Sequence, residues 1–300
     1  MDQPIIECVP NFSEGRDATV VTRIADAIAS VEGVAILNQT SDRDHNRSVF
    51  TFAGVPDAVV EAAFRAIECA VSLIDLSRHA GVHPRVGAAD VVPLVPVSGV
   101  SLEFCAQLAA RLGERVWREL RVPVYLYEAA ARRPDRANLA NIRRGRFEKL
   151  REEVRHNPAR LPDFGTAALH PTAGACVIGA RPFLIAFNIN LATADVEIAR
   201  RIARKIRSSS GGLPAVKALG LYLESRGHAQ VSTNLTNFEV TPLCAIVEAV
   251  RAEAERNGIS IQSTELIGLI PRKALETAGG CELGITTEQV LENRLESLLR

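Results

Sequence analysis

The feature of this sequence that most constrains its fold is an apolar pattern whose period changes repeatedly along the chain. Segments with the two-residue period of strands follow segments with the 3.6-residue period of helices. This alternation is typical of α/β and α+β proteins, so we predict an α/β (α+β) fold. The predicted strands lie within 5–10, 34–41, 47–54, 90–97, 122–129, 176–191, 217–235 and 260–270, and the predicted helices are 17–31, 56–77, 101–120, 139–156, 194–209 and 241–258.

A turn-rich segment, 157–175, separates the predicted elements into two groups. It contains three prolines and two glycines and is interpreted as an ordered loop or linker. After it, pairs of strands alternate with helices, which predicts a mixed sheet with helices packed over one face. We therefore expect two subdomains, 1–180 and 181–300.

Composition excludes several classes of protein. The chain has 35 basic and 35 acidic side chains, so it lacks the basic field that binds nucleic acid without sequence preference. Its first residues do not resemble a signal peptide, and no apolar run is long enough to cross a bilayer. We expect a cytoplasmic protein with no nucleic-acid or membrane partner. The six cysteines form no CxxC pair and are expected to be reduced thiols in the core.

The stretch HAGVHPRVGAAD, residues 79–90, concentrates groups that can do chemistry. His79 and His83 have the four-residue spacing of a helical zinc site, but Gly81 and Pro84 disfavour a helix through both. We therefore predict no metal site. A histidine beside Arg85 in a glycine-containing loop fits proton transfer next to an anionic substrate.

Three other segments are unusually polar for their predicted positions. Residues 42–47 join two apolar strands and carry side chains that donate, accept or hold charge, although a solvated turn also explains them. Asn188 and Asn190 alternate with apolar residues and point to one face of a strand, as do the polar residues between 230 and 236. Such a face either meets solvent or lines a ligand site.

Several separate runs closely resemble one family. ECVPNFSEG, DHNRSV, GVHPRVGAAD, PVYLYE, RPFLIAFNINL, SSGGLPAVKALG, QVSTNLTNFEVTP and ELIGLIP are similar, in this order, to the formiminotransferase domain of the formiminotransferase-cyclodeaminase family. The resemblance implies transfer of the formimino group of N-formimino-L-glutamate to N5 of the co-substrate tetrahydrofolate. It also implies two α/β subdomains with a folate cleft between them, and a homodimer.

The resemblance also implies roles for particular residues. The histidine of its HPR element, the catalytic base, corresponds to His83, and no metal is implied. Members of this family usually have proline at the position that Thr166 occupies here, directly after Gly165. The chain ends at Arg300 without a cyclodeaminase domain, so we expect a separate enzyme to act on the product. The implied folate-binding loop is Gly165, Thr166, Ala167, Ala168, Leu169, His170, Pro171, Thr172, Ala173 and Gly174.

The acidic substrates require cationic partners, because a guanidinium can pair with a carboxylate through two hydrogen bonds. Arg47 and Arg85 are candidates for the donor, and Lys217 or Arg181 for the folate tail. The further substrate-binding candidates are Asp44, Asn46, Asn188 and Asn190, and the carboxylates that could orient His83 are Asp42, Asp44 and Asp90.

Three alternatives stay open at this point. The donor could be another molecule, such as N-formylglutamate, or the chain could bind folate without catalysis. A metal-dependent hydrolase built on His79, His83 and Asp90 is the third.

Overall fold

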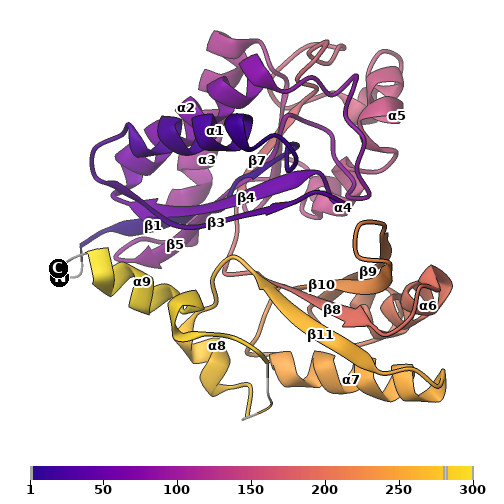
Figure 1. Ribbon diagram of the computed structural model, residues 1–300. Coiled ribbons are helices and arrows are strands. Elements are labelled where there is room, and N and C mark those ends of the chain that lie inside the picture. The colour runs from indigo at the N-terminus through magenta and orange to yellow at the C-terminus, as the bar shows by residue number, and fades with distance from the viewer. Residues whose placement is uncertain (1–2, 280, 282, 299–300) are drawn as a thin grey trace. The chain divides into compact units, whose positions relative to one another are not determined.

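A computed structural model of the protein describes residues 3–279, 281 and 283–298 (Figure 1). The chain divides into two compact units, Met1–Arg181 and Pro182–Arg300. The strands of the first unit are β1 (Ile5–Cys8), β2 (Asn11–Phe12), β3 (Val34–Asp42), β4 (Arg47–Gly54), β5 (Ala89–Ser98), β6 (Val124–Glu128) and β7 (Cys176–Ala180). Its helices are α1 (Ala18–Ala29), α2 (Pro56–Leu73), α3 (Leu102–Leu120), α4 (Leu139–Ile142) and α5 (Arg146–Glu153), with short 3-10 turns at Pro134–Arg136 and Pro158–Arg160.

The first unit is built on a mixed sheet. β3 pairs with β4, which pairs with β1 and β2, and these pair in turn with β5, all antiparallel. β7 then runs parallel between β5 and β6. Helices α1, α2 and α3 lie along one face of this sheet (Figure 1), where apolar side chains such as Phe50 and Phe52 are fully buried. A second apolar cluster, containing Tyr125, Tyr127, Ile142 and Leu150, packs beneath α4 and α5.

Two helices are shorter in the structure than the sequence predicts. The segment 139–156 is not one helix, because Gly145 and Arg146 have φ values of 82° and 58°, which end α4 and start α5 in a new direction. The helix predicted over 56–77 ends at Leu73. Leu76 lies beyond it and is buried in the core, and its backbone N–H donates to the Thr172 carbonyl (2.8 Å).

The turn-rich segment 157–175 is an ordered loop of the first unit and not a linker. Phe164 forms a bridge with Val124 of β6, and Gly174 forms another with Gly87 ahead of β5. The segment predicted as a continuous strand region, 176–191, is divided between the two units. Its first half is β7, and its second half begins the sheet of the second unit.

The second unit is built on an antiparallel sheet in the order β11-β8-β10-β9, and not on the mixed sheet that the sequence predicted. Helices α6 and α7 cover one face of it (Figure 1), where Phe187, Ile189 and Val231 are fully buried. The strands are β8 (Ile185–Leu191), β9 (Val216–Leu223), β10 (His228–Leu235) and β11 (Ile261–Ile267), and the helices are α6 (Val196–Ile206), α7 (Leu243–Arg256), α8 (Arg272–Glu276) and α9 (Leu291–Leu298), with 3-10 turns at Ser208–Ser210 and Thr287–Gln289.

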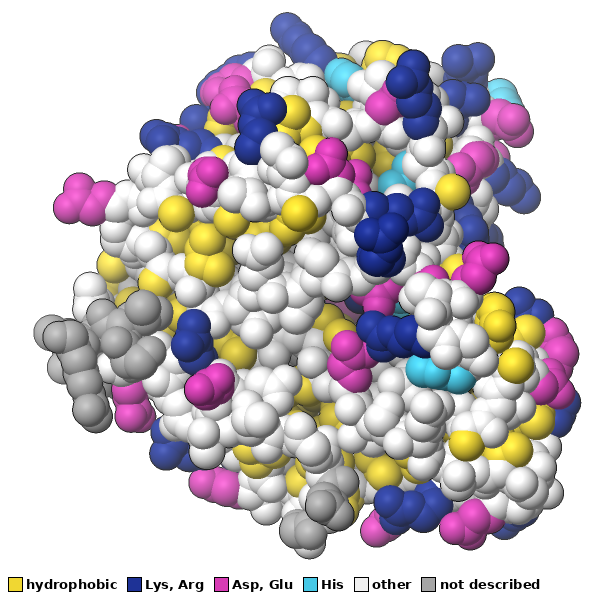
Figure 2. Space-filling model, viewed as in Figure 1, with side chains coloured by type: hydrophobic (Ala, Val, Ile, Leu, Met, Phe, Trp, Pro, Cys, Tyr) yellow, Lys and Arg dark blue, Asp and Glu magenta, His cyan; other side chains and the backbone are white. Residues whose placement is uncertain are grey.

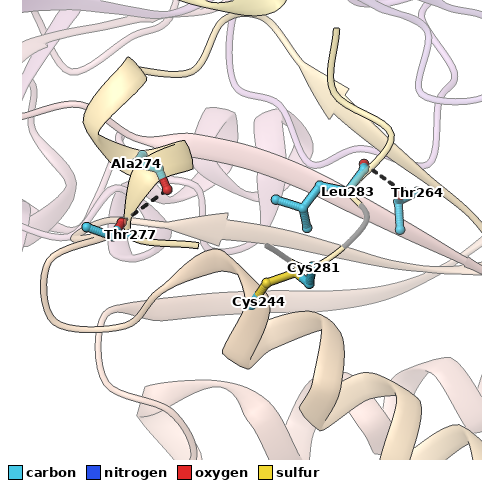
Figure 3. Close-up of a disulfide and its surroundings, with 6 residues drawn as sticks. All are labelled: Cys244, Thr264, Ala274, Thr277, Cys281 and Leu283. Carbon is cyan, nitrogen blue, oxygen red and sulfur yellow. Dashed lines mark hydrogen bonds between the residues drawn. A yellow bond between two sulfur atoms is a disulfide. The ribbon is translucent and has the colours of Figure 1, made fainter. Parts of the chain in front are cut away.

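The expectation that every cysteine is reduced is wrong for two of them. Cys244, in the first turn of α7, is joined by a disulfide to Cys281 (Figure 3), and their Cα atoms are 6.0 Å apart. Thr264 Oγ1 of β11 donates to the Leu283 carbonyl (2.9 Å), which fastens Leu283 to the sheet. The two cysteines are 37 residues apart in sequence, and only the fold brings them together.

The surface agrees with a chain of zero formal net charge. Basic and acidic side chains are interspersed over the face drawn in Figure 2. Within the residues that the structure describes, no helix is both long and apolar enough to cross a membrane.

Candidate active site

A small pocket in the first unit gathers polar side chains from three separate parts of the chain. The β3–β4 turn supplies one group, the segment leading into β5 supplies another, and Ser13 comes from the loop after β2. The lining residues are Ser13, His45, Asn46, Arg47, His79, His83, Arg85 and Asp90.

The pocket forms because the β3–β4 turn and the loop that carries Gly81 approach so closely that their backbones are in contact. The Val82 N–H donates to the Asp44 carbonyl (3.1 Å). A Cβ atom on Gly81 would lie only 2.4 Å from the His45 carbonyl oxygen, so no larger residue fits there without movement. Asn46, at φ 46°, fastens the turn: its side chain accepts from Gly15 N–H (3.0 Å) and donates to the Ala80 carbonyl (3.0 Å). The predicted ligand-binding residue Asn46 therefore holds the loops together.

His83 is half-buried in this pocket, and its ring is held by Arg47. Arg47 Nη1 lies 2.8 Å from His83 Nε2, and the His45 ring stacks on His83 with centroids 5.8 Å apart. A guanidinium only donates, so Nε2 accepts and the ring proton is assigned to Nδ1. Burial, and then the positive charges of Arg47 and Arg143, hold the pKa of His83 well below its usual value. The imidazole is thus neutral near pH 7, as a general base must be.

Positive charge predominates around His83. Arg143, at the end of α4, pairs with Asp90 of β5, whose other oxygen accepts from Val86 N–H (2.7 Å). Burial and the neighbouring Arg143 lower the pKa of Arg47 to about 10, although Asp90 and Asp42 oppose the shift. Such a cluster of cations favours an anionic ligand.

His79 and Arg85 support the pocket through a chain of hydrogen bonds. Arg85 is buried, donates from Nε to His79 Nδ1 (2.8 Å), and forms two bonds with Glu148 of α5 (2.8 and 3.2 Å). His79 Nε2 then donates to the Asn46 carbonyl (2.9 Å). Both ring nitrogens of His79 are therefore occupied, and the residue lies beyond the end of α2. Among the described residues, no cluster of three or more His, Cys, Asp or Glu is arranged to hold a metal ion.

The predicted folate-binding loop, 165–174, has one exposed half and one anchored half. Residues 165–168 are exposed, and Gly165 has a φ of 147°, which favours glycine. His170 and Gly174 exchange backbone hydrogen bonds (2.9 and 3.1 Å), and Ala88 N–H donates to the Ala173 carbonyl (2.9 Å). The buried end of the loop therefore adjoins the segment that carries His83.

The other predicted site residues, Asn188, Asn190 and Lys217, lie in the second unit. Cross-strand register puts Asn188, Asn190 and Gln230 on the sheet face opposite Phe187 and Ile189. Gln230 Nε2 donates to Asn190 Oδ1 (2.9 Å), and Asn190 Nδ2 donates to Ser263 Oγ (2.9 Å). Within the described residues, the buried Gln230 Oε1 accepts no hydrogen bond. Lys217 pairs across the strand with Asn234 at the edge of the same sheet.

Ser13, Arg143 and Glu148 are residues of the site that were missed from the sequence. Arg143 and Glu148 fall in a segment predicted as a single charged helix. Gly145 inside that helical pattern was the available signal, because an internal glycine is a common point of interruption.

Comparison with known families now adds to this geometry. The family model of the formiminotransferase domain, N-terminal subdomain, matches residues 5–181, and that of the formiminotransferase domain matches residues 186–294. The chain belongs to the formiminotransferase family. The resemblance inferred from the sequence is confirmed, as is its α/β fold.

Relatives within the formiminotransferase family align over nearly the whole chain. A glutamate formimidoyltransferase of Thermoplasma acidophilum is 47% identical, and one of Streptococcus pyogenes is 43% identical, each over 97% of this chain and 97–98% of its own length. The mouse formimidoyltransferase-cyclodeaminase is 46% identical over 90% of this chain, a match that spans 51% of the mouse protein.

Proposed function

We propose that this formiminotransferase is a glutamate formimidoyltransferase. It moves the formimino group of N-formimino-L-glutamate to N5 of tetrahydrofolate and releases L-glutamate, as in histidine degradation. The observation that carries the proposal is the neutral imidazole of His83 in a cationic pocket, 2.8 Å from Arg47. The two relatives at 47% and 43% identity, which bear this enzyme name, support it.

His83 has the properties that proton transfer requires. Near neutral pH it accepts the proton that N5 releases and returns it to the departing glutamate nitrogen, so one residue serves as base and then as acid. The low pKa of the buried imidazole makes the protonated form short-lived, which favours this return.

Of the other candidate site residues, some are proposed to contact the substrates and others to hold the loops of the site in position. Arg47 is proposed to contact a carboxylate of the donor, whereas Arg85 already makes bonds to Glu148 and His79 and is proposed to position the loop. The exposed half of loop 165–174 is proposed to meet folate. Asn188 and Asn190, on the polar sheet face of the second unit, are proposed as substrate-binding residues. Lys217 and Arg181 are candidates for the folate tail.

A spectroscopic transfer assay with tetrahydrofolate tests the proposal. The expected result is transfer from formiminoglutamate in the wild type and a fall of about 100- to 10,000-fold in turnover in His83→Ala. His156→Ala is the matched control, because His156 is exposed and lies outside the pocket. Its turnover should stay at the wild-type level.

Other outcomes identify the alternatives. Transfer from N-formylglutamate in place of formiminoglutamate would change the donor and keep the reaction class. Folate binding without transfer from either donor would favour a binding protein. Turnover in His83→Ala equal to that of the control would remove His83 from the chemistry.

The proposal also covers the oligomeric state, the location of the enzyme and the next enzyme of the reaction sequence. We propose that the enzyme acts as a homodimer in the cytoplasm, and that a separate cyclodeaminase acts on the product. The relative that combines both names in one chain, from mouse, supports the pairing of the two activities.

A further inference from the structure

The contact between Arg47 and His83 raises a problem for a catalytic base. Arg47 Nη1 lies 2.8 Å from Nε2 and 3.4 Å from Nδ1 of the same ring. The lone pair of Nε2 is therefore engaged by a guanidinium, and a nitrogen engaged in this way does not accept a proton from a substrate. The resting pocket holds its base in a blocked state.

Two carboxylates near Arg47 accept hydrogen bonds from other groups. Asp90 accepts from Val86 N–H and from Arg143, and Asp42 Oδ1 accepts from the His45 N–H (2.8 Å). A neutral imidazole thus serves as hydrogen-bond acceptor for a half-buried guanidinium. A carboxylate is the better acceptor for a guanidinium, because it carries the opposite charge and its two oxygens can accept two parallel N–H bonds.

We propose that Arg47 gates His83: it occupies Nε2 in the resting enzyme and releases it when a carboxylate of the donor takes its place as acceptor. This inference rests on the proposed function, which supplies a donor with two carboxylates. No covalent bond changes in this step. An N–H of Arg47 exchanges an imidazole nitrogen for a carboxylate oxygen, and the lone pair of Nε2 becomes free to accept a proton.

The charges around the ring strengthen the effect. His83 faces Arg47 from β4, His45 from the β3–β4 turn, Arg143 after α4 and Arg146 at the start of α5, and the positive groups among them disfavour the imidazolium. Asp90 and the supporting His79 and Arg85 complete the pocket lining. A bound carboxylate brings negative charge to this cluster, so donor binding should raise the pKa of His83 as well as uncover its nitrogen.

The gate would couple base activation to donor binding. Until a donor carboxylate arrives, Nε2 is unavailable to N5 of folate or to water. The donor carboxylate would then contribute to turnover and not only to affinity, which separates a gate from a simple anion contact.

The test is a pH titration of the His83 imidazole by ¹⁵N NMR, with and without L-glutamate, the unreactive product. The His83 signal is assigned by its absence in His83→Gln. In the wild type we expect a pKa well below the usual value, rising when glutamate is added. Arg47→Gln should have a raised pKa in both conditions, because the guanidinium that blocks and repels is gone.

Arg146→Gln is the matched control. It removes one positive charge near His83, from an exposed side chain whose influence on the ring is smaller than that of Arg47. Its His83 should keep the response to glutamate. The acid limb of kcat/KM gives a second readout, which should move to higher pH in Arg47→Gln and much less in Arg146→Gln.

Each contrary outcome has a distinct meaning. A wild-type titration that glutamate leaves unchanged over its whole concentration range overturns the gate, and this measurement needs no variant to fold. An Arg47→Gln pKa as low as the wild-type value also overturns it. If the enzyme transfers the formimino group but glutamate does not raise the pKa of His83, the proposed function stands and the gate is rejected. If glutamate raises the pKa but neither donor reacts, the gate stands and the proposed function is rejected.

Discussion

The pocket around His83 and the polar face of the second sheet hold buried polar groups in different ways. In the pocket, loops meet at backbone distance, and charged side chains from β4, α4 and α5 converge on one ring. On the sheet, Asn190 lies between Gln230 and Ser263 because strand register puts these residues opposite one another. The first arrangement depends on tertiary contacts of irregular backbone, and the second on regular strand pairing.

Because of this difference, substitutions in the pocket should alter activity, whereas substitutions on the sheet should mainly lower stability. Loop residues in the pocket perturb one another's pKa values, so a small displacement alters both shape and charge. The amides on the sheet do not titrate, and a change there should cost stability without altering the chemistry of His83. The predictions below test this separation.

Among the substitutions that separate the pocket from the sheet, the largest effect is expected for Gly81→Ala. The new Cβ would lie 2.4 Å from the His45 carbonyl oxygen, so the loop carrying His83 must move. Forced overpacking costs about 1–3 kcal/mol of unfolding free energy. A displacement of about 1 Å at a catalytic group lowers turnover on the order of 100-fold. Denaturant unfolding and the transfer assay measure the two quantities.

Gly227→Ala is the matched control for this substitution. Gly227 is in the turn between β9 and β10 and has a φ of 67°, and a Cβ atom added there would meet no heavy atom within 4 Å. Its backbone strain should cost about 1–2 kcal/mol and leave turnover unchanged. Equal turnover in the two variants would contradict the close approach of the two loops.

Sequence reasoning recovered regular elements and their faces well. The two-residue period predicted that Asn188 and Asn190 share a strand face, and the structure confirms this through their pairing with Ser232 and Gln230. The predicted β3–β4 hairpin, with polar residues at its turn, is also confirmed. These features depend on local periodicity, which a sequence displays directly.

Contacts between distant segments could not be read in the same way. Arg143 reaches Asp90 across 53 residues, and the interruption at Gly145 lets Phe147 N–H donate to the Arg85 carbonyl (2.9 Å). The disulfide of Cys244 has the same origin, since no spacing pattern links it to Cys281. Periodicity carries no information on which loops meet, so the partners of His83 could be identified only from the three-dimensional structure.

A smaller effect is expected for Asn190→Leu on the second sheet. It leaves the Gln230 Nε2 and Ser263 Oγ atoms without their present partner. Ser263 is exposed, but Gln230 is buried, and an unsatisfied buried group costs about 1–3 kcal/mol. The NMR titration of His83 should be unchanged. Asn234→Ala, at an exposed position on the same strand face, should change stability by less than about 0.5 kcal/mol. A shifted His83 pKa in Asn190→Leu would show that the two regions are coupled.

The smallest effect is the contribution of His83 to the pH dependence of stability. Its folded-state pKa lies below the unfolded value of about 6.5. As pH falls below the unfolded pKa, His83 becomes protonated in the unfolded chain but stays neutral in the folded protein. The stability that His83 contributes is therefore full above about pH 6.5 and is lost as pH falls toward the folded pKa. The slope is at most about 1.4 kcal/mol per pH unit for one proton.

Urea unfolding of the wild type and of His83→Gln at several pH values between about 5 and 7 measures this contribution. His79 and His170 also have lowered pKa values, but both remain in the variant, so their contributions cancel in the difference. The wild-type curve should fall more steeply toward acid than that of the variant. Parallel curves would mean that His83 titrates alike in the folded and unfolded chains, and the pocket would then lack the buried, cation-rich environment that distinguishes it from the sheet.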